Sequence, residues 1–453
     1  MTNDFIEQSL EIFKKFNSNK LFYQDLPSYD QLVTADAFKI SADDFEIIRK
    51  NGPLLQNWVK EQKHLFREMF KSKKLAWLKE KLIDDTSKET LSYYEKLLDQ
   101  PDKYTQILRA DLSSLPYGCH EPQFRWAGFP YILLIPKIYE EVVNSSKSPN
   151  RDISFFIQKT IDEFCREKNE SAIYLSPQKY MRANYNTIKI LRRTLLISVP
   201  TLNEKNFAIK KGKLVHKETG LTIKLIFRHQ ISLATLIETT FGRKLIELYL
   251  DNNLHFEPDL DILNDLKLGM ALVSDERTRS FFSDDSRRLF LKTAIAEKNM
   301  HSFNSVFNTQ FNNYSDFIEK TTRSTRRYVY KYGGMDMHMS HGAREVYRLD
   351  DSENHCRRIL NKNSRLWIIQ QMDSTRYKFR FLKGDYTQKN TCEIVEDSNF
   401  SARFEVFYYL DGDSVEPITL IANLVNNHWK SRFKTSNQID GEGSVVTPIC
   451  IRK

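Results

Sequence analysis

Apolar side chains in the first hundred residues recur at the spacing of an α-helix. Within 57–82 they fall near one face of a helix, mostly three or four positions apart. The positions are Trp58, Leu65, Phe66, Met69, Phe70, Leu75, Trp77, Leu78 and Leu82. Residues 1–100 are therefore predicted to form a packed helical extension.

The pattern changes after about residue 105. From 109 to 136 it indicates strands and turns, and the apolar run near its end consists of strand-forming residues. The spacing predicts helices over 153–167 and 187–193, and the second leads into a buried strand at 194–200. Two short strand-like runs around a Lys-Gly-Lys turn predict a hairpin over 207–216.

Further along, the pattern predicts a strand at 221–227 and then turns helical from 259 to 298. Ser283 is a helix-start signal, because its short side chain can accept a hydrogen bond from a free backbone N–H. A new lobe is predicted to begin near residue 300. Alternation over 403–413 predicts a strand and a turn, with 418–425 as the partner strand.

These elements predict an α+β fold with mixed sheets. A chain of 453 residues is long enough for two or three domains. We expect boundaries between 1–100, 101–300 and 301–453. Hydrophobic residues make up 40% of the chain and aromatic residues 12%, which is typical of a folded protein and argues against extensive disorder.

Charge and cysteine usage narrow the class of protein. The formal net charge of +9 suits nucleic acid, a site that gathers ATP and carboxylates, or simply a solvated basic surface. Lysine and arginine are spread along the chain, which argues against a dedicated nucleic-acid arm. The five cysteines form no CxxC pair, so reduced thiols and no structural zinc site are expected. The apolar runs are too short for a membrane span and the N-terminus does not match a secretory signal, which predicts a cytoplasmic protein without a membrane partner.

Candidate chemistry is densest where an apolar run ends in Lys331 and is followed by Gly333 and Gly334. Lysine supplies a mobile charge for phosphate, and glycines allow backbone N–H groups to close on phosphate oxygens. A second apolar run ends in the amides Gln370 and Gln371, which can face a purine edge. This interpretation is a nucleotide-phosphate clamp. The alternative is an ordinary hairpin turn with a surface lysine.

Polar residues earlier in the chain complete a longer series of motifs. Arg109 and Asp111 form an Arg-x-Asp pair, and Glu121-Pro-Gln123 follows. A strand at 221–229 then leads to Glu-Pro at 257–258 and to a lysine at 267. Next come the lysine strand and glycine-rich loop at 328–342 and the amide-bearing strand at 367–372. With its motifs in this order, the chain resembles the glutathionylspermidine synthetase-like, circularly permuted branch of the ATP-grasp ligases. A glutamine stands where that family usually has the asparagine of a Glu-x-Asn metal pair.

The resemblance implies an ATP-grasp-like fold and an ATP-dependent carboxylate–amine ligase that forms an amide or peptide bond through an acyl phosphate. Its implied cofactors are ATP and Mg²⁺, and its implied substrates are a carboxylate and an amine, such as an amino acid, a peptide or a polyamine. Arg109 would stabilise the transferring phosphoryl group. Mg²⁺ would be held by Asp111, Glu121 and Gln123. ATP would be bound by Lys331, Gly333, Gly334, Ser340, Gln370, Gln371, Met372, Arg432 and Asn437.

Other interpretations of the same residues stay open. Arg109 and Asp111 can form a structural salt bridge, and Glu121 can lie in a solvated turn. The basic stretch around Arg432 can be a plain hairpin, and Glu405 and Asp411 are spare carboxylates able to replace a failed metal ligand. The histidines at 338 and 341 suggest a metal or acid/base role, but a spacing of three occurs by chance in a polar loop, and chance is the favoured interpretation.

A second class of function also stays open. The chain can be a non-catalytic protein on a degenerate ATP-grasp scaffold that binds nucleic acid or protein through its basic and aromatic surface. The departure from Glu-x-Asn supports that alternative. The oligomeric state is not predicted from the sequence.

Overall fold

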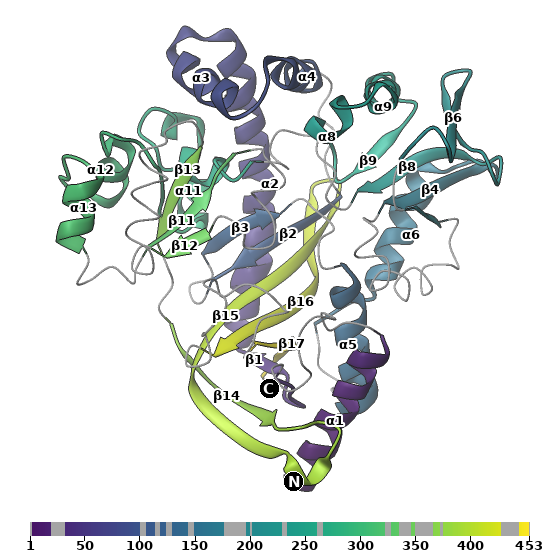
Figure 1. Ribbon diagram of the computed structural model, residues 1–453, viewed down its shortest axis with the longest axis vertical. Coiled ribbons are helices and arrows are strands. Elements are labelled where there is room, and N and C mark those ends of the chain that lie inside the picture. The colour runs from purple at the N-terminus through teal and green to yellow at the C-terminus, as the bar shows by residue number, and fades with distance from the viewer. Residues whose placement is uncertain are drawn as a thin grey trace.

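The computed structural model describes residues 2–19, 32–99, 106–113, 118–123, 129–143, 149–175, 196–199, 202–228, 233–260, 266–321, 328–334, 346–348, 366–371, 375–426 and 444–452. In these ranges the chain forms three β-sheets with helices around them (Figure 1). The predicted α+β class with mixed sheets is confirmed.

The N-terminal helices are α1 (Thr2–Ser18), α2 (Ala42–Lys71), α3 (Ala76–Asp85) and α4 (Lys88–Leu98). The predicted helical stretch 57–82 is confirmed by α2 and α3. A capping box starts α2, because the Ser41 side chain accepts from the backbone of Asp44 and the Asp44 side chain accepts from the backbone of Ser41.

A seven-stranded sheet forms the centre of the molecule (Figure 1). Its strand order is β1-β17-β16-β15-β2-β3, with β14 paired to β15. The strands are β1 (Phe38–Ile40), β2 (Ile107–Leu112), β3 (Cys119–Gln123), β14 (Tyr377–Lys383), β15 (Glu393–Asp411), β16 (Ser414–Asn426) and β17 (Ser444–Ile451). The predicted strand pair 403–413 and 418–425 is confirmed as the β15–β16 hairpin, which turns at Gly412 with a φ of 61°.

Helix α2 packs on one face of this sheet, where its apolar stripe joins Leu108, Phe404 and Val406 in one core. The contact is close at Gly52, where an added Cβ would lie 2.8 Å from the ring of Tyr408. The Tyr408 hydroxyl donates to the carbonyl of Ile48 at 2.8 Å. The N-terminal helices therefore share a core with the sheet.

The opposite face of the sheet meets α1, α5 (Phe129–Val143) and α6 (Ile153–Phe164) in a second core. The prediction of strands and turns up to residue 136 is wrong at its end, because α5 is a helix. A short apolar run fits a buried helix as well as a strand, and this one packs beside α1, β16 and β17. The helix predicted over 153–167 is confirmed by α6, and the one at 187–193 lies outside the described residues.

A six-stranded sheet follows in the chain, in the order β5-β4-β8-β7-β6 with β9 beside β8. Its strands are β4 (Glu170–Leu175), β5 (Leu196–Val199), β6 (Phe207–Lys210), β7 (Lys213–His216), β8 (Thr222–Arg228) and β9 (His255–Glu257). The predicted hairpin over 207–216 and the predicted strands at 194–200 and 221–227 are confirmed. Helices α8 (Leu233–Ile237) and α9 (Thr240–Leu250) pack on each other next to this sheet.

A four-stranded sheet has the order β10-β13-β11-β12, formed by β10 (Thr293–Ile295), β11 (Tyr328–Tyr332), β12 (Val346–Arg348) and β13 (Trp367–Gln371). One face is aromatic and is covered by α12 (His301–Phe307) and α13 (Tyr314–Thr321). The other face carries Lys331 and Gln370, because β11 and β13 pair antiparallel with Lys331 opposite Ile368 and Gln370 opposite Val329.

The long helical stretch predicted over 259–298 is only partly correct. The described part holds α10 (Gly269–Leu272), the 3-10 helix η5 (Arg279–Phe281), α11 (Asp284–Leu289) and then strand β10. The start signal is confirmed, since the Ser283 side chain accepts from the backbone of Ser286. Across the described residues, no helix combines the length and apolar character needed to cross a membrane.

Candidate functional site

A row of polar side chains crosses four neighbouring strands of the seven-stranded sheet. Residues opposite each other in a β-ladder point to the same face, so the register defines this row. Asp111 lies opposite Glu121 on one side and Glu405 on the other, and Arg403 lies opposite Asn423. We call this row the polar strip: Glu121 on β3, Arg109 and Asp111 on β2, Arg403 and Glu405 on β15, and Asn423 on β16.

Four charged groups in the strip form a closed ring of ion pairs. Arg109 contacts Asp111 through Nε at 2.9 Å and Glu405 through Nη2 at 3.0 Å. Arg403 contacts the other oxygens of the same two carboxylates, at 3.2 Å and 2.5 Å. The side chain of Asp111 is 0% exposed and that of Glu405 is 1% exposed. Charges can be buried this deeply only when each is matched by an opposite charge in good geometry.

The ring shifts the ionisation of its members in different directions. Burial raises the pKa of Asp111, although Arg109 and Arg403 oppose the rise. Burial also acts on Glu405, but there Arg109 and Arg403 outweigh it and lower the pKa. Burial acts to lower the pKa of Arg403, but Asp111 and Glu405 outweigh it and raise that pKa. The ring thus holds two cations against two carboxylates whose charges depend on each other.

Lys331 reaches the strip from the four-stranded sheet. Its Nζ donates to Gln370 Oε1 at 2.8 Å and lies 3.5 Å from Glu121 Oε2. Lys267 pairs with the other oxygen of Glu121 at 3.0 Å. Burial lowers the pKa of Lys331 to about 8, and Glu121 opposes the shift. A lysine of this kind is poised to change its charge and its partner near neutral pH.

The glycine turn after Lys331 is tied down by its neighbours. The N–H of Gly333 donates to the carbonyl of Leu366 at 2.7 Å, and the carbonyl of Gly333 accepts from Leu268 at 2.9 Å. Asp85 of α3 accepts a 2.6 Å hydrogen bond from the Tyr332 hydroxyl, and an added Cβ at Gly334 would collide with its carboxylate. The Gly333 N–H is therefore engaged within the protein in this arrangement, and a phosphate contact from it stays a prediction.

The structure brings together Arg109, Asp111, Glu121, Lys331 and Gln370. The sequence predicted that the Gln370 amide faces a purine edge, but the structure places it differently. It is fully buried, its amide oxygen holds Lys331 and its nitrogen donates to Thr293 at 3.0 Å.

The other predicted site residues divide into two groups. Gln371 lies opposite Tyr328 on the other face of the small sheet and is exposed. Gln123 lies opposite Arg109 in β3, with only its backbone described. Outside the described residues lie Ser340, Met372, Arg432, Asn437 and the histidines at 338 and 341.

The two spare carboxylates, Glu405 and Asp411, lie in different places. Glu405 joins the ring, whereas Asp411 pairs with the partly exposed Lys159 at 2.7 Å. Sequence reasoning missed Arg403 and Asn423. The signal for Arg403 was present, since Arg403-Phe-Glu405 repeats the charge spacing of Arg109-Ala-Asp111 in a second buried strand. No comparable signal marks Asn423.

The strip contains hard oxygen donors of the type that Mg²⁺ prefers. In this arrangement, however, each oxygen of Asp111, Glu121 and Glu405 has an arginine or lysine partner. Among the described residues, no group of three or more His, Cys, Asp or Glu side chains is placed to hold a metal ion. A metal can enter only if the lysines or arginines move to another anion.

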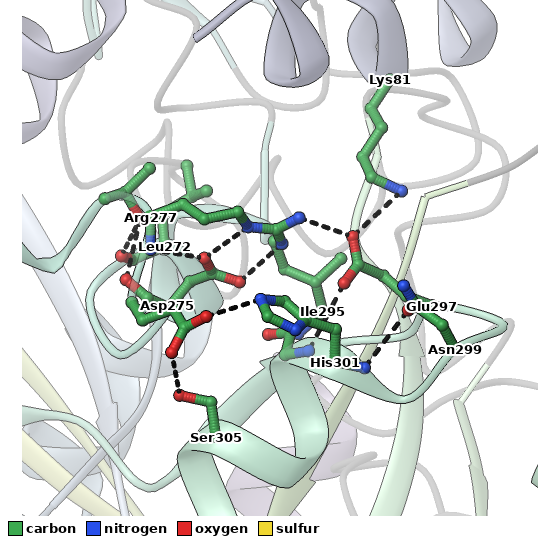
Figure 2. A network of polar contacts seen from close by, with 12 residues as sticks. Lys81, Leu272, Asp275, Arg277, Ile295, Glu297, Asn299, His301 and Ser305 are labelled. Atoms are coloured by element: carbon green, nitrogen blue, oxygen red, sulfur yellow. Dashed lines mark hydrogen bonds and ion pairs between the residues drawn. The ribbon is translucent and has the colours of Figure 1, made fainter. Parts of the chain in front are cut away.

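A second charged network lies beside the four-stranded sheet, and Figure 2 shows it. Arg277 donates twice to Asp275, both at 2.8 Å, and once to Glu297 at 3.1 Å. Lys81 of α3 lies 3.5 Å from Glu297, and the guanidinium of Arg277 stacks 3.8 Å from the ring centre of Trp77. We call these five residues the Arg277 network. It fastens α3 to the segments before and after β10.

Comparison with known proteins does not assign the chain to a family: no family model matches it, and no curated protein matches it in sequence.

Proposed function

We propose that this protein is an ATP-dependent carboxylate–amine ligase on an ATP-grasp-like fold, with its reaction centre where Lys331 meets the polar strip. One observation carries the proposal. Lys331 and Glu121 belong to separate motifs, far apart in the chain and on different sheets, and their charged atoms lie 3.5 Å apart. The resemblance to the ATP-grasp ligases implies that the lysine proposed to bind phosphate and the carboxylates proposed to bind metal belong to one site, and this contact supports that proposal.

The balance of charge supports an anionic ligand. Four cationic side chains, Arg109, Arg403, Lys267 and Lys331, face the three carboxylates of Asp111, Glu121 and Glu405. Triphosphate oxygens compete with Glu121 for the two lysines. When the lysines turn to phosphate, the oxygens of Glu121 become available to Mg²⁺ that accompanies the nucleotide. Binding is thus an exchange of ion partners.

The proposed reaction has two steps. A carboxylate oxygen of the acid substrate attacks the γ-phosphorus of ATP, the bond to the bridging oxygen breaks, and an acyl phosphate and ADP form. The amine then attacks the acyl carbon and displaces inorganic phosphate, losing a proton as the amide forms. Arg109 holds its guanidinium fork against Asp111 and Glu405, so it is already oriented when charge shifts onto the transferring oxygens.

Nucleotide binding is the direct test. ATP at about 100 times its dissociation constant should add about 2.7 kcal/mol to the free energy of unfolding, measured as a Mg²⁺-dependent thermal shift. Lys331→Met should lose the shift. The matched control is Lys378→Met, since Lys378 is 66% exposed and its ion pair within the described part of the chain is with Glu396 at the surface. An equal shift in parent and Lys331→Met would remove Lys331 from the site.

Turnover is the second stage of the test. Pairs of amino acids and short peptides are screened for release of inorganic phosphate from ATP, with Lys331→Ala as the inactive comparison. Release by the parent with one acid–amine pair, and its loss in Lys331→Ala, would establish ligase activity and name the substrates together.

One observation favours a non-catalytic alternative. The strip is fully ion-paired on its carboxylate side, and the N–H of Gly333 is engaged by Leu366. A static scaffold that binds nucleic acid or protein needs no rearrangement of these pairs. Absence of any ATP-induced shift, with and without Mg²⁺, would select this alternative.

A further inference from the structure

Within the described part of the chain, Asn423 is the member of the polar strip whose side chain makes no polar contact. It is 2% exposed, and neither its Nδ2 nor its Oδ1 has a hydrogen-bond partner among the described residues. Its neighbours across the sheet are Arg403 on β15 and the apolar Val446 on β17. Of the two residues directly opposite Asn423, Arg403 is the polar one.

Arg403 has a matching unused atom. Two of its nitrogens hold Asp111 and Glu405, while its Nε is buried and has no hydrogen-bond partner. Because Arg403 and Asn423 are directly opposite, their Cβ atoms are about 5 Å apart. Two donors and one acceptor are thus left unused at one point of the sheet.

Buried polar atoms in folded proteins are nearly always paired, so an unpaired group on a well-ordered strand indicates a missing partner or a functional cost. Asn423 is not at an edge where water reaches it freely. Arg403, however, keeps 14% of its side chain exposed, so the side chain that carries the unused Nε also reaches solvent. The missing partner can therefore come from outside the protein.

The surroundings decide which ligand fits. The ring of Arg109, Arg403, Asp111 and Glu405 contains two charges of each sign, so it already balances itself. A further charged group would have to be desolvated beside it without a counter-ion. A neutral planar group with an acceptor and a donor side by side satisfies all three unused atoms at no such cost.

We infer that Asn423 and the Nε of Arg403 form a binding subsite for a neutral donor–acceptor edge. The acceptor takes hydrogen bonds from Asn423 Nδ2 and Arg403 Nε, and the donor gives one to Asn423 Oδ1. The inference rests on the proposed function, which supplies two sources of such an edge: an amide group on the acid substrate, or the amino-purine edge of ATP.

The first experiment asks whether the amide is unpaired in the free protein. Asn423→Leu keeps the volume and removes the unused polar atoms, so the melting temperature should equal or exceed that of the parent. Asn426→Leu is the matched control on the same strand, because Asn426 is also fully buried but donates to Asp397 at 2.8 Å, and its melting temperature should fall. A fall in Asn423→Leu as large as that in Asn426→Leu would show a structural partner and overturn the inference.

The second experiment identifies the source of the edge. In one arm, calorimetry compares ATP with purine riboside triphosphate, which lacks the exocyclic amino group. In the other arm, succinamic acid is compared with monomethyl succinate in the presence of a non-hydrolysable ATP analogue and Mg²⁺. The primary amide of succinamic acid presents its C=O and one N–H side by side, and the methyl ester replaces that donor by a methoxy oxygen. In one arm, the dissociation constants of the two compounds for the parent should differ at least tenfold. Asn423→Leu should lose that difference, whereas Asn426→Leu should keep it.

The outcomes separate this inference from the function beneath it. Discrimination that vanishes in Asn423→Leu supports the subsite, and the arm that shows it names the ligand. A parent that binds ATP with Mg²⁺ but discriminates in neither arm, or a variant that discriminates as the parent does, overturns the subsite alone. A parent that does not bind ATP overturns the proposed function and the subsite with it.

Discussion

The polar strip and the Arg277 network use the same side-chain chemistry in two different ways. Both pair an arginine with two carboxylates, and both have a lysine at one end. In both networks an arginine pairs with a carboxylate two residues away, but Arg277 keeps 27% of its side chain exposed. In the strip the partners come from three strands and a second sheet, and Lys331 is 1% exposed.

The two networks differ in how completely their polar atoms are paired. The Arg277 network has a stacked aromatic ring and a part-exposed arginine, as a fastening between helix α3 and its neighbour requires. The strip leaves Asn423 and the Nε of Arg403 unpaired and contains a lysine whose pKa falls to about 8 because of burial. Ion pairs alone therefore do not mark a functional site. What distinguishes the strip from the Arg277 network is its unpaired buried atoms and the lowered pKa of its buried lysine.

The largest expected effect is on stability in the strip. Asp111→Ala leaves Arg109 and Arg403 to share one buried carboxylate, which should lower the free energy of unfolding by about 3–5 kcal/mol. Asp275→Ala should cost less, because Arg277 retains Glu297 and access to water. Urea unfolding of both variants tests the comparison. Equal losses would mean that burial does not distinguish the two networks.

Titration of Lys331 should be visible as a pH-dependent stability. Its pKa is about 8 when folded against 10.5 for an ordinary lysine, so between these values the unfolded chain binds more protons and the folded state gains stability as pH rises. The parent should gain up to about 3 kcal/mol over Lys331→Met from pH 8 to 10.5, measured by urea unfolding. Below pH 8 Lys331 is protonated in both the folded and the unfolded state, so this gain in the free energy of unfolding is absent. A difference that stays flat with pH would contradict the shifted pKa.

Ligand binding should reverse that titration. Phosphate favours charged Lys331, so ATP affinity should weaken as pH rises above about 8, by no more than about tenfold per pH unit. Calorimetry in buffers of different ionisation enthalpy should detect proton uptake on ATP binding at pH 9. The Lys331→Met variant, which cannot take up this proton, provides the comparison, and uptake of the same size in both proteins would exclude Lys331 as its source.

Arg109→Lys separates geometry from charge. The variant keeps a cation but loses the two-pronged contact with Asp111 and Glu405. Turnover should fall by roughly tenfold or more, about 1.4 kcal/mol in the barrier, while ATP affinity changes little. Phosphate release at the parental rate on a confirmed substrate pair would make Arg109 a purely structural partner.

The smallest effect is expected in the Arg277 network. Trp77→Leu removes the stacking partner of Arg277 and should lower the free energy of unfolding by about 1 kcal/mol. The ATP-induced shift should remain as in the parent. Loss of that shift would mean that α3 controls the reaction centre through its contact with the Lys331 turn.

Much of the secondary structure follows from local pattern. The β6–β7 and β15–β16 hairpins and the helices α2 and α6 have clear periodicity or turn residues, and all four were predicted. Helix α5 was not, because an apolar run of strand formers has no period that distinguishes a strand from a buried helix. Its tertiary partners decide its conformation.

The sequence predicted residues of the candidate site but not the contacts between them. Lys331, Arg109 and the carboxylates were found by residue type and order. Arg403 and Asn423 were not, since their importance comes from strand register: Arg403 matters because β15 lies beside β2, and Asn423 because it faces Arg403. The whole sheet determines which distant strands pair, so no local sequence pattern predicts that pairing.

The contact between Tyr408 and Ile48 joins positions 360 residues apart. A ribosome adding about 5–20 residues per second needs roughly 20–70 s to make that span. During this time α2 and β2 exist without the strand that covers the first and neutralises the second. Arg109 and Asp111 emerge long before Arg403 and Glu405 of β15, which complete the ring of ion pairs. The polar strip therefore forms only after β15 has been made, and a nascent chain that stalls before β15 exposes both the apolar stripe of α2 and an unpaired edge of β2 to chaperones and proteases.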